Sequence, residues 1–201
     1  MAFSFTTHFL YFLIMLVFAP NLNPTQAIRP ESNPTDTEFI KTSCKVATFP
    51  DLCYHSLSTY ASDIQASPKL LANTALSVTI ASTQTALDTV SKLSKAHGML
   101  SRDGEAIRDC LEVLGDAVEE LQKSITKMGK IENNKKFEFM INDIQTWVSA
   151  ALTNEDTCMQ GFEEKGIFGK TKNIIRGNIV NVCHLTSNAL ALVNNYASLH
   201  S

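Results

Sequence analysis

Apolar residues recur at helical spacing along this chain, from residue 36 almost to its end. Four long stretches carry apolar side chains three and four positions apart, which is the period of one face of an α-helix. No stretch alternates between apolar and polar residues in the way that is typical of strands. We therefore predict an all-α fold. The clearest row, in the helix expected after Ser101, is Ile107, Leu111, Leu114, Val118, Leu121, Ile125 and Met128.

Local signals place the ends of these helices. Ser67 followed by Pro68 predicts the first start, because serine caps the first turn and proline fits the first helical position. Short links between the stretches favour antiparallel neighbours, so the prediction is an up-down-up-down four-helix bundle over residues 67–197. The third and fourth helices are expected over about 135–158 and 171–197, with links around Gly98, at 129–134 and at 166–169.

Two shorter helical segments precede the bundle, at about 36–44 and 50–60. Pro50 forces a break between them, because proline has no N–H to donate and restricts the residue before it. A bond between Cys44 and Cys53 would close these segments into a helical hairpin.

Residues 1–27 have the features of a secretory signal peptide. An apolar run at 9–19 is followed by polar residues and then by small residues before position 28. The competing interpretation is a membrane anchor, but this run is much shorter than the roughly 20 residues that a spanning helix needs. We expect a secreted, soluble chain, with a flexible lead-in at 28–35 and one domain at 36–198, of which 36–60 is the hairpin.

Export would make the cysteines candidates for cross-links, and their number is odd. Five cysteines with one left over allow fifteen arrangements, so spacing alone proves no pairing. Cys110 lies in the middle of the second long helix and Cys158 at the end of the third, where a bond would join two antiparallel helices. Cys183 lies beside the core row of the last helix. A small buried apolar role is favoured for it over an intermolecular or redox role.

Charge and motifs exclude several function classes. The formal net charge is −3, which argues against binding to nucleic acid or directly to an acidic polysaccharide. The sequence contains no nucleophile elbow, zinc-protease motif or phosphate-binding glycine loop, and its five histidines are scattered without metal-ligand neighbours at helical spacing. We expect a protein that is not an enzyme and that needs no metal or cofactor.

An acidic row on the second helix is a candidate binding surface. Glu112, Asp116 and Glu119 fall at positions i, i+4 and i+7, apart from the apolar row. The simpler interpretation is a solvated face, because helices commonly carry charges on their water side. The alternative is an acidic stripe that docks on a basic or polar partner.

Motifs in order along the chain resemble the plant invertase and pectin methylesterase inhibitor family. The set covers residues 39–197, and its specificity lies in the order and not in any single motif. It comprises Cys44, Thr48, Pro50, Cys53 and Leu57, the pair Leu100-Ser101, the string at 109–112, the tryptophan block at 144–153, Asp156-Thr157-Cys158, and the string at 185–192.

The resemblance implies an antiparallel four-helix bundle with an N-terminal helical hairpin and two disulfides. The family pairs its first cysteine with its second and its third with its fourth. Carried over to this chain, the bonds are Cys44–Cys53 and Cys110–Cys158, and Cys183 is a free thiol.

The family contains two inhibitory activities, which the fold alone cannot separate. Similarity to invertase inhibitors implies a Pro-Lys-Phe tripeptide, which this chain lacks; its nearest string is Pro68-Lys69-Leu70 at a helix start. The string at 110–121 and the tryptophan block look more like the pectin methylesterase branch. We therefore expect a one-to-one inhibitor that covers the pectin cleft of a pectin methylesterase in the cell wall (the apoplast). An acid invertase inhibitor and a non-inhibitory secreted bundle are the alternatives.

The resemblance also suggests which residues face the enzyme. In this family the second helix, with the first and third, makes the contact. Gln160 departs from the family pattern, because an aspartate is common at that position, and this puts the strength or pH dependence of inhibition in doubt. The candidate interface residues are Thr79, Ser82, Thr83, Glu112, Asp116, Glu119, Thr157 and Gln160.

Overall fold

The computed structural model describes residues 33–95, 101–131, 136–164 and 170–200, which all belong to one compact unit at 31–201. The predicted signal peptide at 1–27 and most of the predicted lead-in lie outside the described residues. Asn33, at the end of that lead-in, caps a helix, because its side-chain oxygen accepts a hydrogen bond from the Thr35 N–H at 3.2 Å. The first helix therefore begins at Pro34, two residues earlier than expected.

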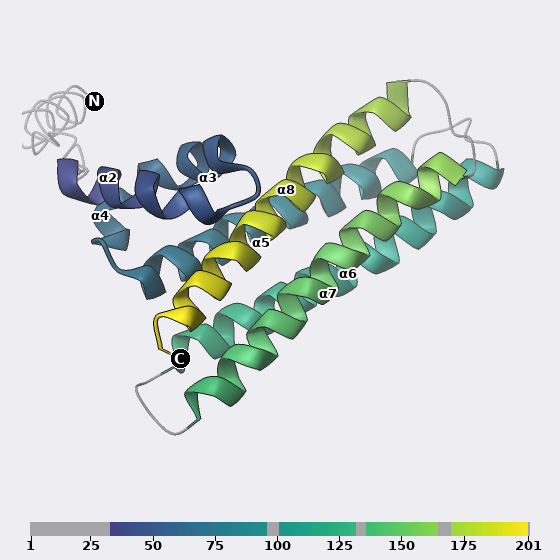
Figure 1. Ribbon diagram of the computed structural model, residues 1–201. Helices are drawn as coiled ribbons and strands as arrows, with labels where there is room; N and C mark the ends of the chain where they lie inside the picture. The colour runs from purple at the N-terminus through teal and green to yellow at the C-terminus, as the bar shows by residue number, and fades with distance from the viewer. Residues whose placement is uncertain (1–32, 96–100, 132–135, 165–169, 201) are drawn as a thin grey trace, which may run out of the picture. The chain divides into compact units, whose positions relative to one another are not determined.

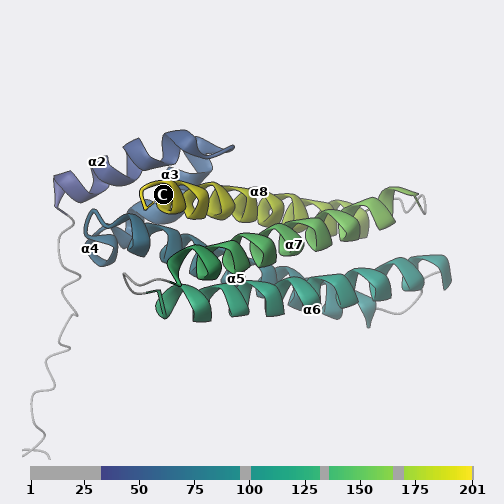
Figure 2. The same ribbon diagram turned by 60° about the horizontal axis from the view of Figure 1, so that its bottom comes forward.

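The fold is an all-α antiparallel bundle, as predicted, and the described residues contain no strand. Each long helix packs against two others, in the cyclic order α5, α6, α7, α8 (Figures 1 and 2). Among the described residues, no helix is long and apolar enough to cross a bilayer. The long helices are α5 (Pro68–Ser94), α6 (Ser101–Gly129), α7 (Phe137–Glu164) and α8 (Lys170–Ser198).

The start of α5 follows the local signals in the sequence. Ser67 is the N-cap, and its hydroxyl accepts the Leu70 N–H at 3.3 Å, while Pro68 takes the first helical position. Gln65 and Ala66 precede this cap with φ angles of 50° and 53°, in the left-handed region. These two residues turn the chain sharply from the preceding short helix into the bundle.

The inner face of α5 is less apolar than its sequence suggests. The apolar residues at helical spacing along this helix pass from Val78 to Ala86, and in the structure the buried positions between them are Thr79 and Thr83. Each hydroxyl donates to the carbonyl four residues earlier, at 2.8 and 2.9 Å, and so brings its own acceptor into the core. Polar side chains therefore occupy the middle of the bundle.

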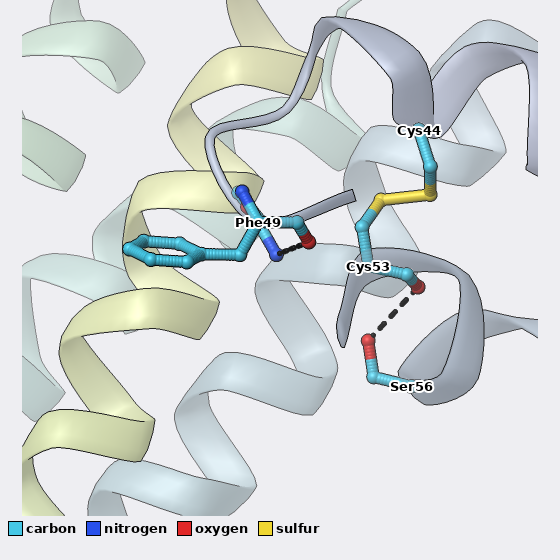
Figure 3. The surroundings of a disulfide bond; sticks show 5 residues. Cys44, Phe49, Cys53 and Ser56 are labelled. Carbon is cyan, nitrogen blue, oxygen red and sulfur yellow. Dashed lines mark hydrogen bonds between the residues drawn. A yellow bond between two sulfur atoms is a disulfide. The ribbon is translucent and has the colours of Figure 1, made fainter. Parts of the chain in front are cut away.

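A helical hairpin precedes the bundle. α2 (Pro34–Ser43) leads through η1 (Cys44–Val46) to α3 (Pro50–Leu57), and α3 packs on both α5 and α8. The Cys44–Cys53 disulfide joins η1, directly after α2, to α3 with its Cα atoms 5.7 Å apart, and the Ser56 hydroxyl donates to the Cys53 carbonyl at 3.0 Å (Figure 3). Two further short elements, η2 (Ser58–Tyr60) and α4 (Ala61–Ile64), connect the hairpin to α5.

A second disulfide, Cys110–Cys158, joins α6 to α7 in the core with its Cα atoms 4.3 Å apart. Cys183 on α8 is the free cysteine, and it is half-buried. Burial, followed by the negative charges of Glu155 and Asp156, raises the pKa of its thiol to about 12. A thiol with so high a pKa is an inert packing group at neutral pH.

Candidate partner-binding surface

The acidic row of α6 lies on the outside of the bundle. Glu112, Asp116 and Glu119 are all exposed, whereas Cys110 on the same helix is buried. At 100° per residue, all three carboxylates fall on the side of α6 opposite Cys110. The side chain of Glu119 is 73% exposed and lies 3.7 Å from Lys123, a pair that contributes little to stability because water screens it.

The pairing of α6 with α7 sets which side chains meet along their outer side. The Cys110–Cys158 disulfide and the hydrogen bond from Asn154 Nδ2 to Glu120 Oε2, at 3.1 Å, fix the antiparallel register. In this register Thr157, one turn beyond Asn154, comes level with Asp116. We call the resulting surface the α6–α7 face: it consists of Glu112, Asp116, Glu119 and Glu120 of α6 and Asn154 and Thr157 of α7.

Two side chains of this face, Thr157 and Glu120, already use some of their polar atoms in hydrogen bonds within the protein. Thr157 donates its hydroxyl hydrogen to the Thr153 carbonyl at 2.8 Å, which leaves the oxygen free to accept from a partner. Glu120 is half-buried, and burial raises the pKa of its carboxyl above the usual range, although the hydrogen bond from Asn154 opposes the shift. The raised pKa means that Glu120 loses its negative charge at a higher pH than an ordinary glutamate does.

Gln160 lies outside the α6–α7 face. Its amide donates to Asp156 Oδ2 at 2.6 Å, and Asp156 belongs to the side of α7 that is next to α8. An aspartate at position 160 would place two carboxylates four residues apart, which is unfavourable on a helix. The Gln160 amide therefore avoids the repulsion that a second carboxylate would have with Asp156, and it presents no charge to a partner.

The predicted assignment to the interface is wrong for two residues, Thr79 and Thr83. Thr79 and Thr83 are 1% and 0% exposed, so neither can touch a partner that docks on the folded bundle. The reason is the rotation of α5, which turns them inward toward α7 and α8, where Thr83 lies 3.3 Å from Glu155. Ser82 stays half-buried between α5 and α8, where its hydroxyl accepts from Asn181 at 3.4 Å.

The sequence pattern also missed a cluster around Lys127 of α6. The Lys127 ammonium pairs with Asp143 and lies 4.8 Å from the centre of the Trp147 ring and 5.5 Å from that of Phe139. The helical spacing of apolar residues along α7 includes both Trp147 and Val148, but Trp147 is half-buried, because Val148 takes the inner position. Two consecutive helical residues point 100° apart, which is the signal that could have placed Trp147 outside.

A groove of about 420 Å³ lies where the hairpin turn meets α7 and α8. Phe49 of the turn stacks on His184 there, with ring centres 3.7 Å apart. No group of histidine, cysteine or acidic residues in the described ranges is arranged to hold a metal ion. The groove is lined by Thr48, Phe49, Leu152, Thr153, Asp156, Cys183, His184 and Ser187.

Comparison with known proteins decides the family. A family model described as plant invertase/pectin methylesterase inhibitor matches residues 38–192. The chain belongs to this family. The match spans the hairpin and most of the bundle, so the resemblance noted in the sequence is confirmed over the domain that carries both disulfides.

Similar proteins support this membership in the inhibitor family. The chain is 46% identical to a 21 kDa protein of Daucus carota over 165 residues, which cover 81% of the chain and 86% of the relative. It is 44% identical to pectinesterase inhibitor 10 of Arabidopsis thaliana over 169 residues, covering 83% of the chain. The match covers 54% of that relative, so the chain spans about half of its length.

A solved structure supports the fold independently. The chain superposes with a TM-score of 0.62 on the crystal structure of a mutant form of a pectin methylesterase inhibitor from Arabidopsis, over 77% of this chain and 95% of the other. At 22% sequence identity, this likeness concerns the fold alone.

Proposed function

We propose that this inhibitor-family protein binds a pectin methylesterase one-to-one and covers the cleft in which the enzyme holds pectin. The observation that carries the proposal is the 44% identity with pectinesterase inhibitor 10, together with the family match over residues 38–192. Such a protein acts by occupying a surface and performs no chemistry, so it is not an enzyme.

The α6–α7 face has the properties that a one-to-one inhibitor needs. Its residues stand on two long helices that the buried Cys110–Cys158 disulfide holds in fixed register. A surface that is rigid before binding loses little conformational freedom on association. Its exposed carboxylates, Glu112, Asp116 and Glu119, would steer it toward a basic or polar cleft rim and set the orientation of docking.

The contacts of Lys69 disfavour an invertase inhibitor. The string Pro68-Lys69-Leu70 is the nearest that the chain has to the tripeptide expected of that branch. Pro68 is built into the first turn of α5, and the Lys69 ammonium donates to the Ile131 carbonyl at 2.5 Å. A segment held in this way would have to unfold before it could enter an active site.

Secretion into the cell wall follows from the proposed partner and from the signal peptide predicted at 1–27. The partner acts on a cell-wall polymer, so the two proteins have to share that compartment. Expression with residues 1–27 attached, followed by N-terminal sequencing of the secreted protein, tests this directly. We expect the mature chain to begin near residue 28.

The test of the proposed function is an inhibition assay with purified, oxidised protein. It is titrated against a panel of pectin methylesterases and against acid invertases. We expect loss of pectin de-esterification with an equivalence point at one inhibitor per enzyme, and unchanged invertase activity. Inhibition of invertase alone would establish the other branch. Binding to neither class would leave the non-inhibitory bundle.

A further inference from the structure

One carboxyl group lies completely inside the bundle. Glu155 of α7 is 0% exposed, where α7 faces α5 and α8. Its Oε1 lies 3.3 Å from the Thr83 hydroxyl of α5 and 2.9 Å from the Thr186 hydroxyl of α8. Its Oε2 is buried and has no hydrogen-bond partner. Glutamate is almost never fully buried unless it is paired, so this arrangement requires an explanation.

The hydrogen atoms available at this site favour a protonated carboxyl. Each threonine hydroxyl has one hydrogen and lies within reach of two acceptors: Glu155 Oε1 and a carbonyl of its own helix, that of Thr79 at 2.9 Å or of Val182 at 3.0 Å. With Glu155 ionised, the two hydroxyl hydrogens can satisfy only two of the four contacts. If Glu155 Oε1 carries a hydrogen, a third of these contacts becomes a hydrogen bond, because this hydrogen can be donated to one of the two threonine hydroxyl oxygens.

The surroundings offer no compensation for a negative charge. α5 and α8 present the neutral hydroxyls, α8 also contributes the Cys183 thiol, and α6 contributes Glu120, which is itself acidic. An isolated carboxylate in such a site loses its hydration without gaining an opposite charge. Burial in the first place, and the charge of Glu120 in addition, raise the pKa of Glu155 to about 8.

We infer that Glu155 is built into the core as a neutral carboxylic acid, and that the need to keep this proton between α7, α5 and α8 makes the folded protein less stable as pH rises. The fold therefore carries a buried proton as a structural component. This inference concerns the inhibitor alone and does not depend on the partner proposed above.

The direction of the pH effect follows from linkage. In the unfolded chain this carboxyl ionises near its ordinary pKa of 4.5, whereas in the folded protein it keeps its proton up to about pH 8. Between these values unfolding releases one proton, so stability falls as pH rises, and outside them this group contributes no slope. The limit for one proton is about a tenfold increase in the unfolding constant per pH unit.

The inference is tested by urea unfolding between about pH 5 and pH 8, with the oxidised protein, Glu155→Gln and Asp156→Asn. The glutamine variant keeps the shape and has no proton to release. Asp156→Asn makes the same carboxyl-to-amide change at an exposed neighbour and serves as the control. We expect the unfolding constant of the wild type and of the control to rise up to about tenfold per pH unit more steeply than that of Glu155→Gln. Equal slopes in all three proteins would overturn the inference.

A direct measurement covers the case in which Glu155→Gln does not fold. Carbon-13 NMR of the wild-type protein, labelled at its glutamate carboxyls, follows each titration without any substitution. We expect one glutamate carboxyl, that of Glu155, to titrate above about pH 7. If every glutamate carboxyl titrates below about pH 6, Glu155 is ionised in the folded protein and the inference is wrong.

Discussion

Asn188 of α8 binds both main-chain polar groups of Phe49, the residue at the turn of the helical hairpin. Its Oδ1 accepts the Phe49 N–H at 2.9 Å and its Nδ2 donates to the Phe49 carbonyl at 2.9 Å. Asn188 itself is 3% exposed. A single buried amide thus attaches a turn that is 139 residues away in the sequence to the last helix of the bundle.

We expect Asn188→Ala to loosen the hairpin turn without unfolding the bundle. The substitution leaves the Phe49 N–H without its partner, whereas the Phe49 carbonyl still accepts the Cys53 N–H at 2.9 Å, and the loss costs about 1–3 kcal/mol. Hydrogen exchange should accelerate at the Phe49 amide, while amides in the middle of α6 keep their protection. Asn142→Ala, at an exposed position of α7, is the matched control and should leave exchange at the turn unchanged. Unchanged exchange at Phe49 in Asn188→Ala would show that the amide does not hold the turn.

The two disulfides should contribute unequally to stability. The Cys110–Cys158 bond closes a loop with a sequence separation of 48, and the Cys44–Cys53 bond one of 9. The chain-entropy estimates are about 4 and about 2.7 kcal/mol, respectively. Serine pairs at each site, compared by urea unfolding, should show the larger loss for Cys110→Ser with Cys158→Ser. The reverse order would mean that strain or residual structure outweighs loop length.

Charge reversal on the α6–α7 face should weaken inhibition and leave the fold intact. Glu112→Lys with Glu119→Lys changes two exposed carboxylates, so helix content by circular dichroism should not change. We expect the inhibition constant to rise about tenfold or more, chiefly through slower association that depends on salt concentration. Asp63→Lys makes the same kind of change at an exposed position of α4 and serves as the control. Equal inhibition by both variants would exclude this face from the interface.

Cys183 should react slowly with alkylating agents in the folded protein. Its pKa of about 12, against an ordinary value of 9.0, lowers the thiolate fraction at about pH 8 by roughly a thousandfold. Labelling with iodoacetamide should therefore be slow in buffer and rapid in urea, where the thiol is exposed. Rapid labelling of the folded protein would show that the thiol is accessible and reactive, contrary to a packing role.

The local signals of the sequence were sufficient for the four long helices and for the break at Pro50, but not for α4 (Ala61–Ile64), where no helix was predicted. Ser67 and Pro68 placed the start of α5, and helical spacing identified α6 and its acidic outer side, because capping and amphipathic periodicity depend on neighbouring residues alone. Family motifs, and not spacing, indicated the cysteine pairing. The exposure of Glu112, Asp116 and Glu119 agreed with a row that is separate from the apolar one.

What the sequence could not determine is how the helices are rotated and aligned against one another. Thr79 and Thr83 appeared as polar residues for a surface, yet they line the core, because a threonine hydroxyl can bond to its own helix and needs no water. The contact of Glu155 with Thr83 and Thr186 joins three helices, so no local pattern contains it. The sequence by itself thus determined the helices, whose hydrogen bonds are local. Only the tertiary structure decided which polar side chains are buried, because burial depends on packing between segments that are far apart in the chain.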